Sequence, residues 1–248
     1  GVAEAAALAA GGRLIVEKQK SRRATCAISR ANGVIQADTL GAARGHLSIV
    51  GIGPGQADWR TGAAEAAVRR AEVVVGYGLY LDLIADLVAD KECQTYDLGE
   101  EELRVRAAIE RAAMGANVAL VSSGDAGVYA MGALAHELLD RDDAPPGWDR
   151  ISIALSPGIS AMQAAALRAG APLGHDFCAI SLSDLLTPRT DILKRIKAAA
   201  AGDFVISFYN PVSRRRRDLL SLARDILLQH RPQDTPVILA RDLGRPKE

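Results

Sequence analysis

Residues 46–55 read HLSIVGIGPG, a short apolar and β-branched run that ends in a glycine-rich turn. Such a run is typical of a buried strand, here expected at residues 47–52. The glycines at positions 51, 53 and 55 let the backbone turn sharply and let a ligand come close, although a purely structural turn would use them too. Gln56 stands where a dinucleotide-binding GxGxxG motif needs its third glycine, and Pro54 has no N–H for a phosphate. The stretch therefore predicts a strand and a tight loop, and not a site for nucleotide phosphates.

Beyond this strand the pattern alternates between short apolar strands and helices. In the first part of the chain, strands are expected at 47–52, 73–75, 118–122 and 151–155, and helices at 60–71, 79–88, 101–114, 128–139 and 160–169. In the second part, strands are expected at 177–182, 204–209 and 236–241, and helices at 191–201 and 215–229. Two further short strands are expected near the start, at 14–16 and 25–29. This alternation predicts an α/β fold with mainly parallel sheets that helices cover on both faces.

The chain is expected to contain three parts. Residues 1–45 lack a sustained hydrophobic period and end in a Gly/Ala-rich linker. Residues 46–171 are expected to form an N-terminal α/β domain and residues 172–248 a smaller C-terminal one, with the boundary in the stretch GAPLG at 170–174. Because three strands make a small sheet whose edges need cover, the C-terminal domain is expected to be truncated. A ligand site in the cleft between two such domains is the default expectation.

Composition excludes several classes of protein. Lys plus Arg and Asp plus Glu number 30 each among 248 residues, and this net charge of zero argues against a general nucleic-acid binder. The three cysteines, Cys26, Cys93 and Cys178, have no CxxC spacing, so we expect a reduced, cytoplasmic protein without disulfides or a metal site. No apolar run is long enough to cross a bilayer, and no membrane partner is expected.

Two more glycine-containing motifs follow expected strands. The first reads SSGDAGVY at 122–129, and the second reads SPGISA at 156–161. Ligands of open α/β sheets bind at the carboxyl ends of the strands, and hydroxyls, glycines and one carboxylate suit a small polar cofactor. The alternative for Asp125 is a cap at the start of the next helix, and Ser160 is also a plausible helix cap.

These motifs carry a resemblance to a known family. Gly-x-Gly-Pro-Gly, Gly-Asp-x-x-x-Tyr and Pro-Gly-x-Ser-Ala, in this order, resemble the SAM-dependent tetrapyrrole methylases from about His46 to the end of the chain. Ala126 stands where the family usually has proline, a departure that one branch shares. The segments VVGYGLYLDLI, VSSGDAGVYAMG, GAPLGHDFCAISLSDLLTP and SFYNPVSRRR are similar to the branch that methylates precorrin-3B at C(17). Residues 1–30 resemble the end of the cobalt-precorrin-5A hydrolase family, which implies a fusion polypeptide whose upstream domain has left a remnant in residues 1–45.

The resemblance implies a function in porphyrin and corrin (cobalamin) biosynthesis. The expected reaction is methylation of precorrin-3B at C(17) with contraction of the macrocycle, using S-adenosylmethionine (SAM) and releasing S-adenosylhomocysteine. The expected fold is the two-domain tetrapyrrole methylase fold with its active site in the cleft between the domains, and the expected assembly is a homodimer. Three alternatives remain open: methylation of another precorrin or cobalt-precorrin, a non-catalytic tetrapyrrole-binding scaffold, and a nicotinamide oxidoreductase, which the missing third glycine disfavours.

The resemblance also implies site residues. The expected cofactor contacts are Pro54, Ser123, Gly124, Asp125, Val128, Ser160, Ala161, Tyr209 and Asn210. The substrate-binding candidates are Gly51, Gly53, Gly55, Tyr77, Tyr80 and Arg214. The two tyrosines could instead pack in the core, and the arginine run at 214–217 could be a solvated face or could contact the carboxylates of a precorrin. His175 and Asp184 are the candidates for the general acid or base of ring contraction, although Asp184 could equally cap a helix.

Overall fold

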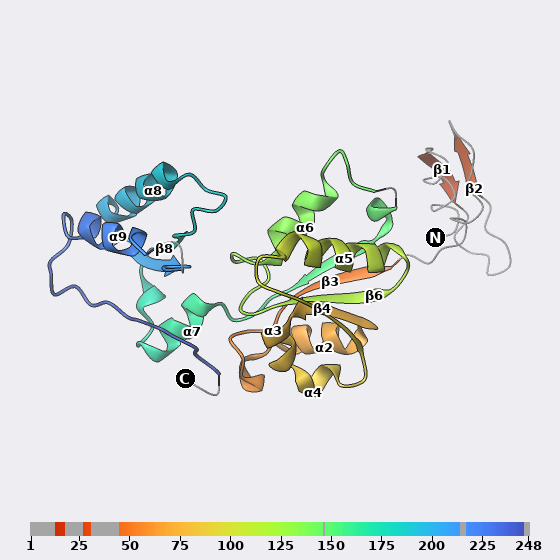
Figure 1. The fold of residues 1–248 in the computed structure, drawn as a ribbon, viewed down its shortest axis with the longest axis horizontal. Coiled ribbons are helices and arrows are strands. Elements are labelled where there is room, and N and C mark those ends of the chain that lie inside the picture. Colours follow the sequence, from red (N-terminus) through yellow and green to blue (C-terminus); the bar gives the residue numbers. More distant parts are fainter. Residues whose placement is uncertain (1–12, 18–26, 31–44, 146, 214–216, 246–248) are drawn as a thin grey trace. The chain divides into compact units, whose positions relative to one another are not determined.

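The computed structural model describes residues 13–17, 27–30, 45–145, 147–213 and 217–245 (Figure 1). The chain divides into two compact units, Gly1–Ser160 and Ala161–Glu248, which we call the N-terminal and C-terminal units. The expected domain boundary at residues 171–172 lies C-terminal to this division and stays a prediction. Near the start of the chain, strands β1 (Arg13–Glu17) and β2 (Ala27–Arg30) pair antiparallel and overlap the two strands expected there.

The N-terminal unit is built on a five-stranded parallel sheet of order β5-β4-β6-β3-β7. Its strands are β3 (His46–Gly51), β4 (Val73–Tyr77), β5 (Glu92–Tyr96), β6 (Asn117–Ser122) and β7 (Ser152–Ser156). The predicted α/β class with a mainly parallel sheet is confirmed. Strand β5 was not expected, because it is an edge strand whose residues ECQTY are mostly exposed and form no apolar run.

Helices cover both faces of this sheet. Figure 1 shows α2 (Gly62–Arg70), α3 (Gly78–Asp82) and α4 (Ala85–Val88) on one face, and α5 (Glu101–Ala113) and α6 (Met131–Leu139) on the other. Alternate residues of central strand β6 enter the two cores: Val118 and Leu120 pack with α5 and α6, whereas Ala119 and Val121 pack with α2 and α4. Because both faces are buried, the strand reads as a continuous apolar run rather than an alternating one. Two 3₁₀ turns, η2 (Ala57–Trp59) and η3 (Trp148–Arg150), complete this unit.

The single helix expected at 79–88 is two short helices in the structure. The break lies at Ile84, whose φ and ψ of −123° and 26° are not helical. The N–H of Leu87 donates to the carbonyl of Ile84 at 2.8 Å instead of reaching the carbonyl of Leu83. The apolar spacing that suggested one helix survives the break, because Leu81, Ile84 and Leu87 all enter the same core. Periodicity alone therefore does not reveal the kink.

The C-terminal unit has a smaller parallel pair of strands, β8 (Phe177–Ser181) and β9 (Val205–Tyr209). Its helices are α7 (Ala161–Arg168), α8 (Arg189–Ala201) and α9 (Leu219–Leu227), with a 3₁₀ turn η4 (Pro172–Gly174) ahead of β8. Helices α8 and α9 share one core with the strands, which includes the buried side chains of Leu182, Ile192, Ile196 and Leu219.

The prediction of a strand at residues 236–241 is wrong. This segment has no regular secondary structure, and the side chains of Val237 and Leu239 are each 90% exposed. A strand forms only where a neighbour pairs with its backbone, and the described residues supply none to this segment. Its β-branched composition was therefore a misleading signal.

None of the described helices is both long and apolar enough to cross a bilayer.

Helix α5 offers a matched test of the core. Ile109 is completely buried between β-strands and helices, whereas Leu103 of the same helix is 58% exposed. We expect Ile109→Ala to lower the free energy of unfolding by about 2–5 kcal/mol, because it leaves a cavity. Leu103→Ala should change it by less than about 0.5 kcal/mol. Urea unfolding followed by tryptophan fluorescence, to which Trp148 of the same core contributes, measures both. Equal losses in the two variants would contradict the packing described.

Candidate functional site

The carboxyl edge of the larger sheet contains a topological switch point. The chain leaves β4 through α3 and α4 on one face to reach β5, and it leaves β6 through α6 on the other face to reach β7 (Figure 1). These connections run in opposite directions from neighbouring strands, whose residues Gly76 and Val121 are paired in register. Ligands of open α/β sheets bind outside the carboxyl ends of strands at such a point.

Three loops meet at this edge. Loop 1 (residues 52–61) follows β3, loop 2 (123–130) follows β6, and loop 3 (157–160) follows β7. Gly53 of loop 1 and Gly124 of loop 2 exchange two backbone hydrogen bonds, with N···O distances of 3.0 and 2.8 Å. The three motifs singled out in the sequence are therefore side by side, although they are far apart along the chain.

The glycines are required because the loop backbones touch. A Cβ on Gly51 would lie 2.6 Å from the carbonyl oxygen of Gly124, and a Cβ on Gly158 would lie 2.1 Å from that same oxygen. Gly53 and Gly124 also have φ of 73°, a conformation that other residues rarely adopt. Of the two explanations for the Gly51–Gly55 motif, the structure supports close backbone packing directly.

Asp125 ties two of the loops together. Its Oδ1 accepts a hydrogen bond from the N–H of Gly127 at 2.8 Å, and its Oδ2 accepts one from the N–H of Gly158 in loop 3 at 3.0 Å. The alternative of a helix cap is wrong, because α6 begins only at Met131 and Ala130 is its N-cap residue. A carboxylate has about four acceptor positions, so these two bonds leave capacity for a ligand.

The remaining cofactor candidates of this unit lie on the same loops. Pro54 and Ser160 are buried, whereas Ser123, Gly124 and Val128 are partly exposed. The hydroxyl of Ser123 donates to the carbonyl of Gly53 at 3.4 Å, a further link between loops 1 and 2. The partly exposed residues are the ones that can present polar backbone or hydroxyl groups to a bound molecule.

Tyr77 and Tyr80 lie next to this edge. Tyr77 ends β4, Tyr80 belongs to α3, and their rings pack edge to face with centroids 5.3 Å apart and planes at 86°. Tyr80 also packs against the core on the α2 face, so the packing role left open by the sequence is confirmed for it. Both rings keep some exposure. Gly55, the last glycine of the motif, is partly exposed in loop 1.

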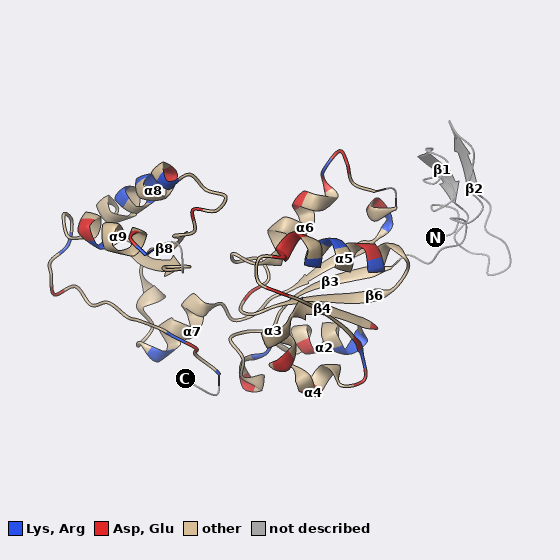
Figure 2. Ribbon diagram, viewed as in Figure 1, with Lys and Arg blue, Asp and Glu red and all other residues tan. Residues whose placement is uncertain are grey.

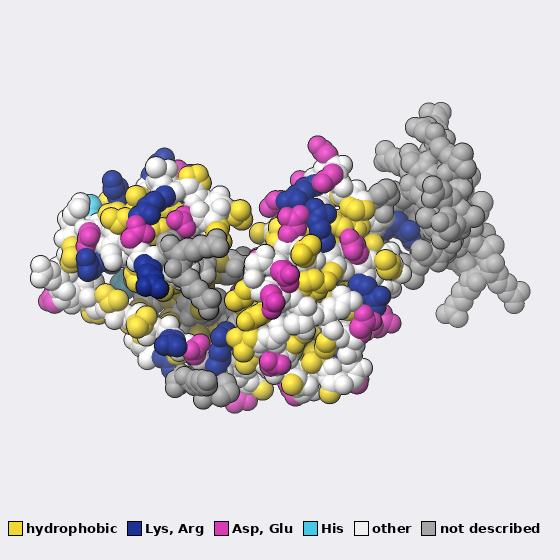
Figure 3. Space-filling view, viewed as in Figure 1, with side chains coloured by type: hydrophobic (Ala, Val, Ile, Leu, Met, Phe, Trp, Pro, Cys, Tyr) yellow, Lys and Arg dark blue, Asp and Glu magenta, His cyan; other side chains and the backbone are white. Residues whose placement is uncertain are grey.

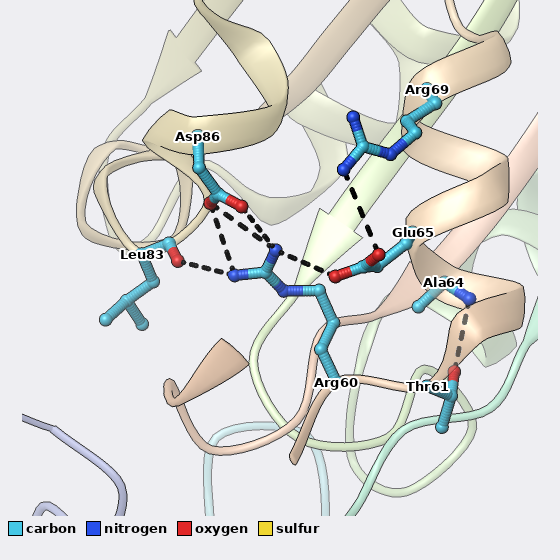
Figure 4. A network of polar contacts seen from close by, with 7 residues as sticks. All are labelled: Arg60, Thr61, Ala64, Glu65, Arg69, Leu83 and Asp86. Carbon is cyan, nitrogen blue, oxygen red and sulfur yellow. Dashed lines mark hydrogen bonds and ion pairs between the residues drawn. The ribbon is translucent and has the colours of Figure 1, made fainter. Parts of the chain in front are cut away.

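Two residues that the sequence did not single out hold loop 1 in place. Thr61 caps α2 by accepting from the N–H of Ala64 at 3.1 Å, and its hydroxyl donates to the carbonyl of Pro157 in loop 3 at 2.9 Å. Arg60 is buried and forms an ion pair with Asp86 of α4 (Figure 4). The cap is local, and a threonine directly before the helix could have indicated it. The bonds to Pro157 and Asp86 join residues distant along the chain, so no spacing in the sequence could reveal them.

In the C-terminal unit, the candidates Tyr209 and Asn210 also follow a strand. The Tyr209 hydroxyl accepts from the N–H of Met162 in α7 at 3.0 Å, next to Ala161, the first residue of that helix. Asn210 has φ of 50°, and its side-chain N–H donates to the hydroxyl of Ser181 at 3.2 Å. Asparagine tolerates this left-handed conformation better than most residues. The first bond links the end of β9 to α7, and the second links the carboxyl ends of β8 and β9.

The structure separates the two acid–base candidates. His175 precedes β8 and Asp184 follows it, so they lie at opposite ends of a five-residue strand, and both are exposed. Asp184 lies near Arg189, the first residue of α8, which forms a bidentate ion pair with Asp218, the residue before α9. The hydrogen bond between them raises the pKa of the Arg189 guanidinium and lowers the pKa of the Asp218 carboxyl. Of the two candidates, only Asp184 lies at the carboxyl edge of β8, whereas His175 lies at its amino end. Arg214 lies outside the described residues.

Charge is distributed unequally along the chain. Residues 46–160 contain 9 Lys and Arg against 18 Asp and Glu, whereas residues 161–248 contain 14 against 9. Figure 2 shows basic side chains along α8, and Figure 3 shows acidic side chains spread over the N-terminal unit. The net charge of zero thus hides a basic C-terminal unit, which would attract an anionic ligand. Among the described residues, no group of three or more His, Cys, Asp or Glu could hold a metal ion.

Comparison with known proteins gives a consistent result. Residues 46–248 match the family of Tetrapyrrole (Corrin/Porphyrin) Methylases. A probable cobalt-factor III C(17)-methyltransferase of Salmonella typhimurium is 47% identical over 202 residues, 82% of this chain and 82% of that protein. The precorrin-3B C(17)-methyltransferase of a Sinorhizobium species is 44% identical over 204 residues, 82% of this chain and 79% of that protein. Among solved structures, the crystal structure of the methyltransferase CobJ is similar, with 42% sequence identity and a TM-score of 0.71. The match covers 76% of this chain and 77% of that chain.

Gly158 provides a test of the loop junction. Gly158→Ala would place a Cβ 2.1 and 2.6 Å from the carbonyl oxygens of Gly124 and Gly51, which are backbone atoms that cannot swing away. We expect the free energy of unfolding to fall by roughly 1–3 kcal/mol, measured by denaturant unfolding. The matched control is Gly174→Ala, since nothing lies within 4 Å of a Cβ there. A control as destabilised as the Gly158 variant would contradict the close contact.

Proposed function

The chain belongs to the tetrapyrrole (corrin/porphyrin) methylase family, and on that premise we propose that it methylates C(17) of a precorrin-3B-type macrocycle. It is a SAM-dependent C-methyltransferase of cobalamin biosynthesis. Two observations together carry the proposal. The family match begins at His46, the first residue of β3, and the three loops of the family motifs meet at one sheet edge. The relatives act on macrocycles named with and without cobalt, so we propose the C(17) position as the shared target.

The residues at the sheet edge fit SAM better than a nucleotide cofactor. SAM has no phosphate, and loop 1 offers none of the features of a phosphate cradle, since Pro54 lacks an N–H and Gln56 replaces the third glycine. The partly exposed hydroxyl of Ser123 and the backbone of Gly124 and Val128 are proposed to hold the polar groups of the cofactor. The partly exposed carboxylate of Asp125 is proposed as a further cofactor contact, and the buried residues Pro54 and Ser160 are proposed to contribute by shaping these loops. From the C-terminal unit, Ala161, Tyr209 and Asn210 are proposed as further contacts.

The reaction requires no activated nucleophile from the protein. The bound cofactor supplies a methyl group on a sulfonium, so the methyl–sulfur bond breaks as the new methyl–carbon bond forms, and a neutral thioether leaves. The attacking group is an electron-rich ring carbon of the substrate. The described residues contribute mainly by aligning the two reactants and excluding water, which is why rigid backbone loops are a suitable scaffold.

The macrocycle is proposed to face loop 1 and the two tyrosines. Gly51, Gly53 and Gly55 allow close approach to the backbone, and Tyr77 and Tyr80 offer flat apolar surface. A precorrin carries many carboxylates, so the excess of Lys and Arg in the C-terminal unit, with Arg214 among them, is proposed to attract it. Contraction of the ring needs a general acid or base, and we propose Asp184 ahead of His175, because Asp184 lies at the carboxyl edge of its sheet.

Two further proposals concern the oligomeric state of the protein and its location in the cell. The protein is proposed to act as a homodimer in the cytoplasm, as expected for a reduced biosynthetic enzyme that uses a soluble substrate. Light scattering that gives a monomer mass at micromolar concentration would refute the dimer.

The remaining alternative, a scaffold that binds a tetrapyrrole without reacting, has no observation in its favour and is tested by the same experiment as the activity.

The direct test is incubation with methyl-labelled SAM and either precorrin-3B or cobalt-factor III, followed by mass analysis of the tetrapyrrole. We expect the product to gain one labelled methyl group with at least one of the two substrates, and S-adenosylhomocysteine to appear in equal amount. Tetrapyrrole binding without label transfer would instead support the scaffold. Label at a ring position other than C(17) would overturn the assigned regiochemistry.

Substitution of Asp125 distinguishes a role in positioning the loops from a role in stability alone. Asp125→Ala leaves the N–H groups of Gly127 and Gly158 without their acceptor, which should cost roughly 1–3 kcal/mol of unfolding free energy. We expect a larger effect on function: a loss of activity of about tenfold or more at a temperature where the variant is folded, because loops 2 and 3 lose their common anchor. Asp125→Asn keeps one carbonyl oxygen and should fall between. An alanine variant that melts lower yet keeps full turnover in the cold would mean that Asp125 is only structural.

A further inference from the structure

Arg60 lies between η2 and α2 and has a buried side chain, only 2% exposed. Its Nη1 donates to the two carboxylate oxygens of Asp86 at 3.4 and 3.1 Å, and the same nitrogen lies 3.5 Å from a carboxylate oxygen of Glu65. Its Nη2 donates to the carbonyl oxygen of Leu83 at 3.2 Å (Figure 4). The acids themselves reach the surface, since the Asp86 side chain is 57% exposed and that of Glu65 is 35% exposed. The cation is thus the buried member of this network.

The bond to Leu83 explains why a buried cation is needed here. The break between α3 and α4 leaves the Leu83 carbonyl without the helical N–H it would otherwise receive, because the N–H of Leu87 donates to Ile84. Leu83 is partly buried, and a carbonyl shielded from water is costly without a donor, so the guanidinium of Arg60 supplies that donor. One planar group therefore satisfies a helix break and two carboxylates at the same time, which an ammonium group cannot do with the same geometry.

The backbone of Arg60 belongs to loop 1. Its N–H donates to the carbonyl of Ala57 at 2.9 Å and closes the 3₁₀ turn η2. The carbonyl of Trp59, the preceding residue, lies so close to Gly53 that a Cβ there would be 2.7 Å from it. The glycine turn and the end of loop 1 are therefore packed on each other, so we expect a displacement of Arg60 to press on the turn.

We propose that Arg60 is a positioning residue. It fixes loop 1 against the α3–α4 segment and so determines where the surface of loop 1 that faces the tetrapyrrole lies. This rests on the function proposed above, in which loop 1 and the tyrosines at positions 77 and 80 bind the macrocycle. Arg60 touches neither reactant in this scheme. We expect the larger effect on the macrocycle side, because the partners Leu83, Asp86 and Glu65 lie on α2 to α4. Loops 2 and 3 also bond to loop 1, but Asp125 holds them to each other independently of Arg60.

The first experiment compares Arg60→Lys with the matched control Arg69→Lys in the full chain. Arg69 also faces Glu65, at 4.0 Å, but its side chain is 61% exposed. For Arg60→Lys we expect KM for the tetrapyrrole to rise roughly tenfold, since small displacements of positioning groups have large effects. We expect the Kd for S-adenosylhomocysteine, measured by calorimetry, to stay within about twofold. The control should match the unaltered protein in both. Equal weakening of both ligands, or an unchanged KM, would overturn the proposal.

A second variant acts from the exposed side of the network. Asp86→Ala removes the principal carboxylate partner while leaving a residue that the surface tolerates. If the two residues act as one unit, the double variant Arg60→Lys with Asp86→Ala should lose no more kcat/KM than the larger single loss. Strictly multiplicative losses would show that the pair is not coupled and would contradict its positioning role.

Trp59 gives a readout that needs no activity. The chain has two tryptophans, so Trp148→Phe leaves Trp59, next to Arg60, as the reporter. We expect the emission of Trp59 and its quenching by acrylamide to change in Arg60→Lys but not in Arg69→Lys, because loop 1 has moved. Identical emission and quenching in all three proteins would overturn the proposal even if the enzyme methylated no tetrapyrrole. Normal methylation with an unchanged KM in Arg60→Lys would reject the role of Arg60 alone and leave the proposed function intact.

Discussion

The structure of the N-terminal unit depends on one constraint: three loops meet backbone to backbone at the carboxyl edge of the parallel sheet. Gly51, Gly124 and Gly158 lie so close that a single added methyl group on Gly51 or Gly158 would overlap a carbonyl oxygen. Such contact is possible only without side chains, and it converts three separate strand ends into one rigid surface. The spacing of the motifs along the chain follows from this, because each must arrive at the same edge.

Polar side chains then hold the surface from outside the contact. Asp125 bridges loops 2 and 3, Thr61 bridges loops 1 and 3, and Arg60 joins loop 1 to the segment that carries Tyr80. Each side chain bonds to backbone groups, so these bonds fix the position of the main chain. For a methyl transfer that needs alignment more than activation, a fixed main chain is the appropriate catalytic device.

The C-terminal unit repeats the principle on a smaller scale. Tyr209 and Asn210 at the end of β9 bond to groups of α7 and β8, and the ion pair of Arg189 with Asp218 joins the starts of α8 and α9. Its excess of basic residues complements the excess of acidic residues in the other unit, which the overall net charge of zero conceals. Composition averaged over a chain is therefore a poor guide to what each unit attracts.

The sequence by itself determined the α/β class, most strands and helices, and the three glycine motifs, because buried strands and tight turns leave local patterns. It missed β5, whose edge position leaves no apolar run, and the break at Ile84, whose side chain stays in register with the core. It wrongly expected a strand at 236–241, because β-branched composition says nothing about whether a neighbouring strand is present. Only the tertiary structure decided that Asp125 and Arg60 act through distant backbone groups, since a hydrogen bond between residues 23 or 33 positions apart depends on how the sheet brings loops together. Local sequence encodes conformation, whereas the positions of these polar bonds follow from the packing of the whole unit.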